Sequence, residues 1–126
     1  MAEAKFYKCK KCANLFVKVQ EGPCTPVCCG EPCDELVAGA TDGAFEKHVP
    51  AVTREGGKIV VKVGEVAHPM LDAHYIQFIA LVTEDRLEIH KLKPGEAPET
   101  TFECDGAENV TIYEYCNLHG LWKAEI

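Results

Sequence analysis

Two groups of metal-ligating side chains stand out in this sequence of 126 residues. The first group contains thiols only: Cys9, Cys12, Cys28 and Cys29. The second group combines four imidazoles with one thiol: His48, His68, His74, Cys116 and His119. Structural metal sites in proteins are usually closed by four ligands, so the second group has an uncommon composition. We therefore expect two different metal sites, with the reaction chemistry at the second.

The thiol group begins with Cys9-Lys-Lys-Cys12, a spacing that lets one tight turn present two sulfurs to a tetrahedral ion. Cys28 and Cys29 are adjacent, which predicts a distorted tetrahedron. Zinc and iron both accept four thiolates, so a structural zinc knuckle stays open as an alternative. Cys24 and Cys33 flank the second pair at four residues on either side, which allows another ligand set. We interpret both as spare small side chains.

The mixed group is carried by segments that we expect to be loops. Cys116-Asn-Leu-His119 repeats the two-residue gap, and Gly120 can close its turn with a positive φ. Pro69 biases His68 toward extended backbone, so the segment to His74 is a loop and not a helix. His48 stands at the mouth of the first strand of its domain. These segments can converge at one end of a sandwich, where binding sites are usually carried.

The mixed group favours reaction with an anion. A divalent ion keeps a net positive charge with neutral imidazoles and one thiolate, whereas four thiolates make their site negative. Five ligands on an ion that accepts six also leave one position open, as catalytic sites require. Glu46 and Lys47 directly precede His48. Either they are a solvated pair, or Lys47 attracts the anion and Glu46 covers or leaves the open position.

Two further residues of ligand type are predicted to have ordinary roles. His90 lies with Glu88 on the polar face of a predicted strand, so we interpret it as a surface or hydrogen-bonded residue. Cys104 alternates with Phe102 and is expected to be a small buried side chain.

The sequence predicts an all-β protein with two domains. Residues 1–37 contain six of the eight cysteines and few core residues, so this part needs a metal, disulfides or a partner to fold. Residues 38–43 are small and polar and are typical of a linker. From residue 48, short alternating strands separated by turn signals indicate an immunoglobulin-like antiparallel sandwich over 38–126. Residues 75–82 are apolar on both faces and predict a central covered strand.

Composition excludes several classes of partner. The net charge of −7 argues against nucleic acid, because such proteins carry a basic face for phosphates. No apolar run reaches signal-peptide length or the roughly 20 residues of a membrane helix. We therefore expect a cytoplasmic protein without a membrane partner. In that reducing compartment, clustered cysteines bind metal more often than they form structural disulfides.

Together these residues make the chain similar to desulfoferrodoxin, the two-iron form of superoxide reductase, over nearly its whole length. The resemblance rests on these segments: residues 7–12 (YKCKKC), 27–32 (VCCGEP), 46–50 (EKHVP), 66–70 (VAHPM), 74–75 (HY), 115–120 (YCNLHG) and 122–125 (WKAE).

The resemblance implies a desulforedoxin-like first domain whose iron is bound by the thiol group. It also implies a sandwich whose iron has the four histidines in a plane and Cys116 on the axis. The implied reaction is the one-electron reduction of superoxide to hydrogen peroxide. Lys47 would guide the anion, Glu46 would ligate the ferric state, and a rubredoxin-like donor would return electrons. The family further implies a homodimer and an electron relay or store at the first iron.

Three rival functions remain at this point. A zinc-binding module would contain zinc without iron. A pure electron carrier would tolerate the change His48→Ala. A superoxide dismutase would release oxygen together with peroxide, whereas a reductase releases none.

Overall fold

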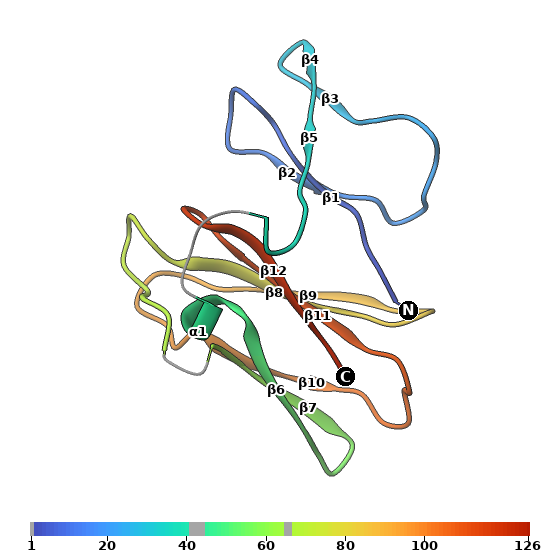
Figure 1. The fold of residues 1–126 in the computed structure, drawn as a ribbon, viewed down its shortest axis with the longest axis vertical. Helices are drawn as coiled ribbons and strands as arrows, with labels where there is room; N and C mark the ends of the chain where they lie inside the picture. Colours follow the sequence, from blue (N-terminus) through green and yellow to red (C-terminus); the bar gives the residue numbers. More distant parts are fainter. Residues whose placement is uncertain (1, 41–44, 65–66) are drawn as a thin grey trace.

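The protein is built from three layers of β-sheet, seen from one side in Figure 1. The computed structural model describes residues 2–40, 45–64 and 67–126, and of residues 45 and 46 it describes the backbone alone. A small N-terminal sheet lies over a four-stranded sheet, which packs on a three-stranded sheet. The prediction of an all-β fold is confirmed.

The N-terminal unit consists of short strands with little core of their own. Its main sheet has the order β2-β1-β5, and a hairpin of β3 and β4 stands beside it. The strands are β1 (Phe6–Lys8), β2 (Leu15–Val17), β3 (Val27–Cys28), β4 (Glu31–Pro32) and β5 (Asp34–Glu35). The β3–β4 turn consists of Cys29 and Gly30, both with positive φ (54° and 76°). Two positive φ angles are what a tight type I′ hairpin turn requires.

The larger unit is an antiparallel sandwich. One sheet has the order β12-β11-β8-β9 and the other the order β10-β7-β6. The four-stranded sheet contains β8 (Ile76–Val82), β9 (Leu87–Lys91), β11 (Thr111–Cys116) and β12 (Gly120–Glu125). The three-stranded sheet contains β6 (Pro50–Glu55), β7 (Lys58–Val63) and β10 (Glu99–Glu103). Apolar residues at alternate positions of both sheets form the core, including Ile59, Val61, Ile79, Leu81, Phe102 and Ile112.

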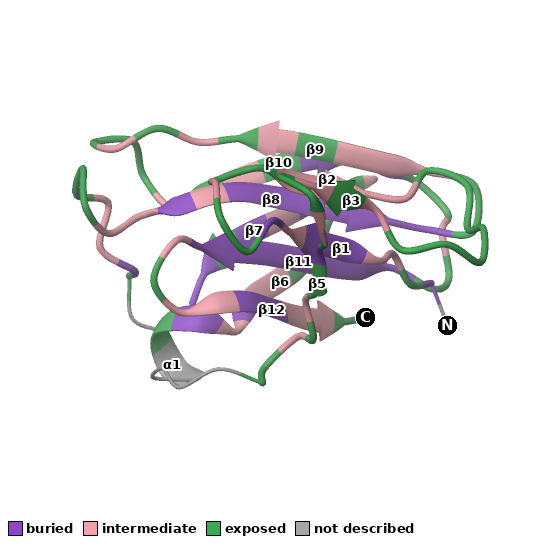
Figure 2. Cartoon of the chain, turned by 90° about the horizontal axis from the view of Figure 1, so that it is seen from above, coloured by how far each residue is buried: buried purple, intermediate pink, exposed green. Residues whose placement is uncertain are grey.

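The central strands β8 and β11 are covered on both faces, as their purple colour in Figure 2 shows. Their inner side chains face the sandwich core, and the outer ones, Phe78 and Tyr115 among them, pack against Phe6 of the N-terminal unit. This explains why residues 75–82 are apolar without alternation. The N-terminal unit therefore obtains its core from the sandwich of its own chain.

The polar residues of the edge strand β9 do not point to solvent, as they usually would in a strand of alternating polar and apolar residues. Leu87 packs toward the N-terminal unit, while the polar residues Glu88 and His90 turn toward the open edge between the two sheets. There His90 stacks on Phe102 at 4.2 Å between ring centroids. The N-terminal unit covers one face of this sheet and the three-stranded sheet covers the other. The polar residues of β9 therefore point toward the second sheet and not directly into solvent.

Two local features bear on the predicted boundaries. A single helical turn, α1 (Phe45–His48), precedes β6 where a loop at the strand mouth was expected. Leu36 and Ala38 pack on the outer face of the four-stranded sheet, and the amide of Gly39 donates to the carbonyl of Leu121 at 2.8 Å. The predicted linker thus begins as a docked segment, and residues 41–43 lie outside the described part of the chain. No helix in the described ranges is long and apolar enough to cross a membrane.

Candidate metal centres

The structure brings the four histidines and Cys116 together at one end of the sandwich. One ligand atom from each side chain lies within 4.8 Å of every other. The imidazoles form a ring in the order His48, His68, His74, His119. Neighbouring rings stand edge-on, with interplanar angles of 71–83° and centroids 4.6–5.0 Å apart. Cys116 and His48 are buried, whereas His74 and His119 are partly exposed, so the group has a buried sulfur side and a solvent-facing side.

The loop between β7 and β8 fixes two of the imidazoles. Nδ1 of His68 lies 2.7 Å from the carbonyl oxygen of Pro69, so Nδ1 is the protonated nitrogen and the lone pair of Nε2 faces the group. Leu71 and His74 exchange two backbone hydrogen bonds, of 2.9 and 3.0 Å, which close the loop before β8. The expectation of a loop here agrees with the observed backbone.

A bulge and a turn position the remaining ligand pair. The pairing of β11 with β8 shifts between Tyr115 and Cys116, where Gln77 is the extra residue in β8. By the alternation of the strand, Tyr115 packs on the outer face and Cys116 in the core. The turn after Cys116 reverses the chain into β12 at Gly120, whose φ is 81°. Sγ of Cys116 then lies 3.8 Å from Nδ1 of His119.

Two histidines of this group, His68 and His74, have pKa values lowered in favour of the neutral imidazole. Burial lowers the pKa of His68 from 6.5 to about 4, helped by the neighbouring imidazoles. Burial also lowers the pKa of His74, with smaller contributions from His119 and the charge of Lys47. Neutral imidazoles offer the lone pairs that a cation needs. Burial raises the pKa of Cys116, although the amides of Leu118 and His119 favour its thiolate, so a cation would displace its proton.

These atoms fit a single metal ion. Nε2 of His48 lies 3.1 Å from Nε2 of His68 and 3.1 Å from Nδ1 of His119. Two nitrogens bound at right angles to one ion at about 2.1 Å would lie about 3 Å apart. Nε2 of His74 is buried and has no hydrogen-bond partner among the described residues. A buried polar atom of this kind is explained by a missing ligand.

The two charged residues before His48 differ in how far they are described. Lys47 is exposed, and its charge acts on the neighbouring His74. The side chain of Glu46 lies outside the described part of the structure, so its predicted position over the open side stays a prediction.

The thiol group is the second cluster of ligand atoms. Sulfurs of Cys9, Cys12, Cys28 and Cys29 lie within 4.8 Å of one another. The Sγ atoms of Cys12 and Cys28 are 3.7 Å apart, and those of Cys28 and Cys29 are 4.0 Å apart. A tetrahedron with metal–sulfur bonds of about 2.3 Å has edges of about 3.8 Å, so these sulfurs also fit one ion. The I′ turn lets the adjacent pair Cys28 and Cys29 reach the same ion.

Backbone amides tune the thiol group unequally. The amides of Lys11 and Cys12 donate to Sγ of Cys9 at 3.4 Å each, and these bonds lower the pKa of Cys9 to about 6. The pKa of Cys29 is raised to about 12, chiefly by its contact with the sulfur of Cys9 and then those of Cys12 and Cys28. Four neighbouring thiols therefore become thiolates together only when a cation compensates their charge.

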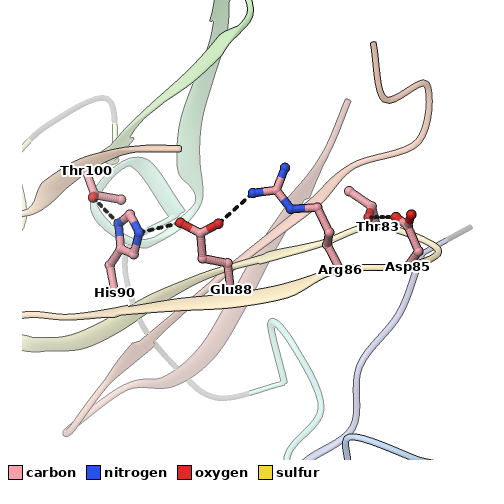
Figure 3. A network of polar contacts seen from close by, with 6 residues as sticks. All are labelled: Thr83, Asp85, Arg86, Glu88, His90 and Thr100. Atoms are coloured by element: carbon pink, nitrogen blue, oxygen red, sulfur yellow. Dashed lines mark hydrogen bonds and ion pairs between the residues drawn. The ribbon is translucent and has the colours of Figure 1, made fainter. Parts of the chain in front are cut away.

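The other cysteines and His90 are not members of either group of ligand atoms. Cys33 is buried beside the thiol group, its pKa is raised by burial, and Cys24 is exposed. Cys104 is buried in the sandwich core, as expected. His90 is hydrogen-bonded to Thr100 (2.5 Å) and Glu88 (2.8 Å), and Glu88 in turn pairs with Arg86 (2.6 Å), as Figure 3 shows. The interpretation of His90 as a hydrogen-bonded residue is confirmed.

Three positions near the mixed group were not singled out from the sequence. Trp122 stacks on His48 at 5.1 Å, and its Nε1 donates to the carbonyl of His119. The Asn117 side chain accepts from the amide of Tyr75 and donates to the carbonyl of Ala73, which ties the turn after Cys116 to the loop of His74. Glu114 is fully buried, its carboxyl oxygens have no hydrogen-bond partner in the described part of the chain, and burial raises its pKa well above the usual value. The roles of Trp122 and Asn117 depend on their neighbours in space, which the sequence alone does not give.

Comparison with known proteins connects this arrangement to one family. The family model described as desulfoferrodoxin matches residues 40–125. Desulfoferrodoxin of Nitratidesulfovibrio vulgaris is 46% identical over 121 residues, covering 96% of this chain and 95% of that protein. Desulfoferrodoxin of Clostridium acetobutylicum is 48% identical over 117 residues, covering 92% of each.

Solved structures with the same fold carry the name superoxide reductase. That of Treponema pallidum superimposes with a TM-score of 0.79 at 35% identity and covers 98% of both chains. A 1Fe superoxide reductase of Giardia intestinalis has a TM-score of 0.58 at 29% identity, and 97% of its length corresponds to 64% of this chain. The resemblance drawn from the sequence motifs is thus confirmed. The chain belongs to the desulfoferrodoxin family.

Proposed function

We propose that this protein is a superoxide reductase that converts superoxide, one electron and two protons into hydrogen peroxide. The observation that carries the proposal is the convergence of four imidazoles and a buried thiol on one point, with the opposite side facing solvent. The superoxide reductases of Treponema pallidum and Giardia intestinalis share the fold of this chain, which supports the same reaction.

Iron is the proposed metal in both groups. When bound by His48, His68, His74, His119 and Cys116, it would supply a one-electron redox couple and a position open to a small anion. The thiol group Cys9, Cys12, Cys28 and Cys29 would bind the second iron. Four sulfurs suit iron and zinc equally, so iron at this site rests on the family.

The residues of the chain define how the site would handle its substrate. The neutral imidazoles add no charge, so the cation is compensated only by the Cys116 thiolate and the site stays attractive to an anion. Lys47 adds a positive charge at the exposed side, which focuses superoxide there although the net charge of the protein is −7. Glu46 would occupy the same side when no substrate is bound. Protons would arrive from water at this solvent-facing side.

The remaining assignments form one consistent set of proposals. Residues 1–37 and 38–126 act as separate functional domains, the first storing or relaying an electron for the second. A rubredoxin-like protein supplies electrons, and two chains form a homodimer. The enzyme acts in the cytoplasm, where its eight free thiols stay reduced.

The experiment that tests the proposal mixes the reduced iron-loaded protein with superoxide without air. Iron absorption, peroxide and oxygen are recorded together. A superoxide reductase oxidises the histidine-ligated iron promptly and forms peroxide without oxygen. Stoichiometric oxygen would establish a dismutase, and unchanged iron at the histidine site would establish a pure electron carrier.

A further inference from the structure

Strand β1 is the wall between the two groups of ligands. Successive residues of a strand face opposite sides. Phe6 accordingly packs with Phe78 and Tyr113 of the sandwich, whereas Tyr7 packs with Cys9 and its neighbouring thiols. Both aromatic residues are buried, with 3% of each surface exposed. The two groups thus share one short strand as their common neighbour.

A stack of aromatic rings leads from β1 to the strand that carries Cys116. The rings of Phe6 and Phe78 have centroids 5.4 Å apart at an interplanar angle of 24°. The rings of Phe78 and Tyr115 follow at 5.9 Å and 8°. These distances lie in the usual range for stacked aromatic pairs. Tyr115 is bonded directly to Cys116, and Phe6 is three residues from Cys9 in the same strand and turn.

A groove between the two units adjoins the ring stack, and Phe6 and Phe78 line one part of it. Asn14, which donates to Sγ of Cys28, and Tyr75, which follows His74, also line this groove of about 400 Å³. Hydrogen bonds also join the units: Oγ1 of Thr111 donates to the carbonyl of Ala2 at the far end of β11, and the amide of Gly39 donates to the carbonyl of Leu121 in β12. Electronic coupling weakens faster across a solvent gap than through bonded or closely packed atoms. The ring stack is the connection that runs through packed side chains from β1, beside the thiol group, to the neighbour of Cys116.

We propose that the stack of Phe6, Phe78 and Tyr115 couples the two iron sites for electron transfer within one chain. This inference rests on the proposed function, because it requires iron in both groups. The step is a single electron transfer: ferrous iron at the thiol group becomes ferric, and ferric iron at the mixed group becomes ferrous. No bond is made or broken and no proton moves. The rings provide orbital overlap and are not themselves oxidised or reduced.

The test measures the rate of this exchange directly. Protein with both irons ferric receives less than one electron per chain from a photochemical reductant in a short flash. The thiolate-to-iron absorption of each site is then followed with time. We expect the thiol-group iron to lose its electron to the mixed-group iron at a rate independent of protein concentration. The changes Phe6→Leu and Phe78→Leu should each lower this rate several-fold.

Matched variants distinguish the loss of electronic coupling through the rings from a general loss of packing. Phe102→Leu removes a buried aromatic ring of the sandwich core that lies off the route, stacked on His90. Phe6→Tyr keeps a ring in the stack, and its hydroxyl can extend into the adjoining groove. The proposal requires slow exchange in Phe6→Leu, near-normal exchange in Phe6→Tyr and Phe102→Leu, and similar thermal midpoints for the two Phe6 variants. Unchanged exchange in both leucine variants of the stack, or equal slowing in Phe102→Leu, overturns it.

The same samples distinguish this inference from the proposed function. The reaction of the reduced mixed-group iron with superoxide should be equally fast in all variants, because the stack does not touch the open side. If superoxide is reduced normally but the wild-type irons exchange no electron, the stack has no such role and the enzymatic proposal stands. If superoxide does not react, the proposed function itself fails.

Discussion

The thiol group and the mixed group solve the same problem, gathering ligand atoms around a point, in opposite ways. The thiol group uses a C-x-x-C turn and one hairpin turn, so each pair of ligands is set by neighbours in sequence. The mixed group takes its ligands from α1, the β7–β8 loop and the β11–β12 turn, which only the complete sandwich brings together. The comparison teaches that a local chelate can be read from spacing, whereas the geometry of a dispersed site depends on the fold.

The thiol group and the mixed group also differ in the charge of their ligands before a metal binds. In the thiol group the pKa of Cys9 is lowered by backbone amides, while the neighbouring sulfurs raise that of Cys29, so a cation is required before all four thiols become charged. The buried imidazoles are already neutral and keep a solvent-facing side. The thiol group therefore suits closed binding and electron storage, and the mixed group suits exchange of a small anion.

Among the changes that test this difference between the two groups, the removal of one imidazole should have the largest effect on iron content and activity. The change His74→Ala deletes a ligand whose buried Nε2 is unpaired within the described ranges. We expect loss of the mixed-group iron and of superoxide reduction, a larger loss than the roughly 10–100-fold cost of an outer-shell change. Metal analysis and peroxide yield measure this, with His90→Ala as the matched control. Retention of both irons would contradict the ligand assignment.

The reverse experiment removes the thiol group alone. We expect Cys9→Ser combined with Cys12→Ser to lose the iron of the N-terminal unit. The mixed-group iron should still react with superoxide at the normal rate when a chemical reductant replaces the donor, because its ligands lie on other elements. Stopped-flow absorption follows that reaction. A comparable loss of reactivity would show that the two sites are not separable.

Asn117 allows a sharper test of how the dispersed site is positioned. Its side chain joins the turn after Cys116 to the loop of His74 through bonds of 2.9 and 3.0 Å. We expect Asn117→Ala to weaken iron binding at the mixed group by about 10-fold, the lower end for outer-shell partners. Competition with a chelator measures the affinity. The exposed Asn109, changed to Ala, should leave affinity unaltered, and equal effects at both positions would refute the positioning role.

Lys47 tests the attraction of an anion to the open side. The change Lys47→Met should slow the reaction with superoxide by up to about 10-fold at low salt and reduce its dependence on ionic strength. Lys62→Met removes an equally exposed charge from β7 and serves as the control. Stopped-flow rates across a salt series decide the matter. Equal slowing by both changes would point to net charge and not to a local effect.

The smallest expected effect is a loss of unfolding free energy of the metal-free protein at low pH. The folded pKa values of His68 (about 4, against an ordinary 6.5) and His74 are lowered by burial, so the unfolded chain binds protons more readily. The stabilisation is complete above pH 6.5 and is lost as the pH falls through the folded values. We expect a loss of about 1–2 kcal/mol in unfolding free energy, less than the full shift implies because water reaches the open side. Denaturant unfolding followed by Trp122 fluorescence measures it, and His68→Gln should flatten the curve.

The sequence was most informative where chemistry and spacing coincide. Alternating residues such as Ile59, Val61 and Val63 predicted strand β7, and the apolar run 75–82 predicted the covered strand β8. The ligand types of the mixed group were visible as loop residues between strands. Their cyclic order was not visible, because it depends on the register shift of β8 opposite Cys116 and on which ring nitrogen of His68 the contact with Pro69 leaves free.

Other features could not be read from the sequence for definite physical reasons. The single turn of α1 is too short to produce a periodic pattern. The polar face of β9 was placed correctly on the strand, but its direction depends on the N-terminal unit covering the other face. Glu114 occupies a strand position that alternation assigns to the interior, and its buried carboxyl runs against the usual composition of a core.

The most direct test of the account is X-ray absorption at the iron edge in the Cys9→Ser/Cys12→Ser variant, where only the mixed group can bind iron. Four imidazoles and Cys116 predict a shell dominated by nitrogen with a single sulfur. A sulfur-rich shell, or a variant that retains no iron, would contradict the central claim that these five side chains bind one iron ion.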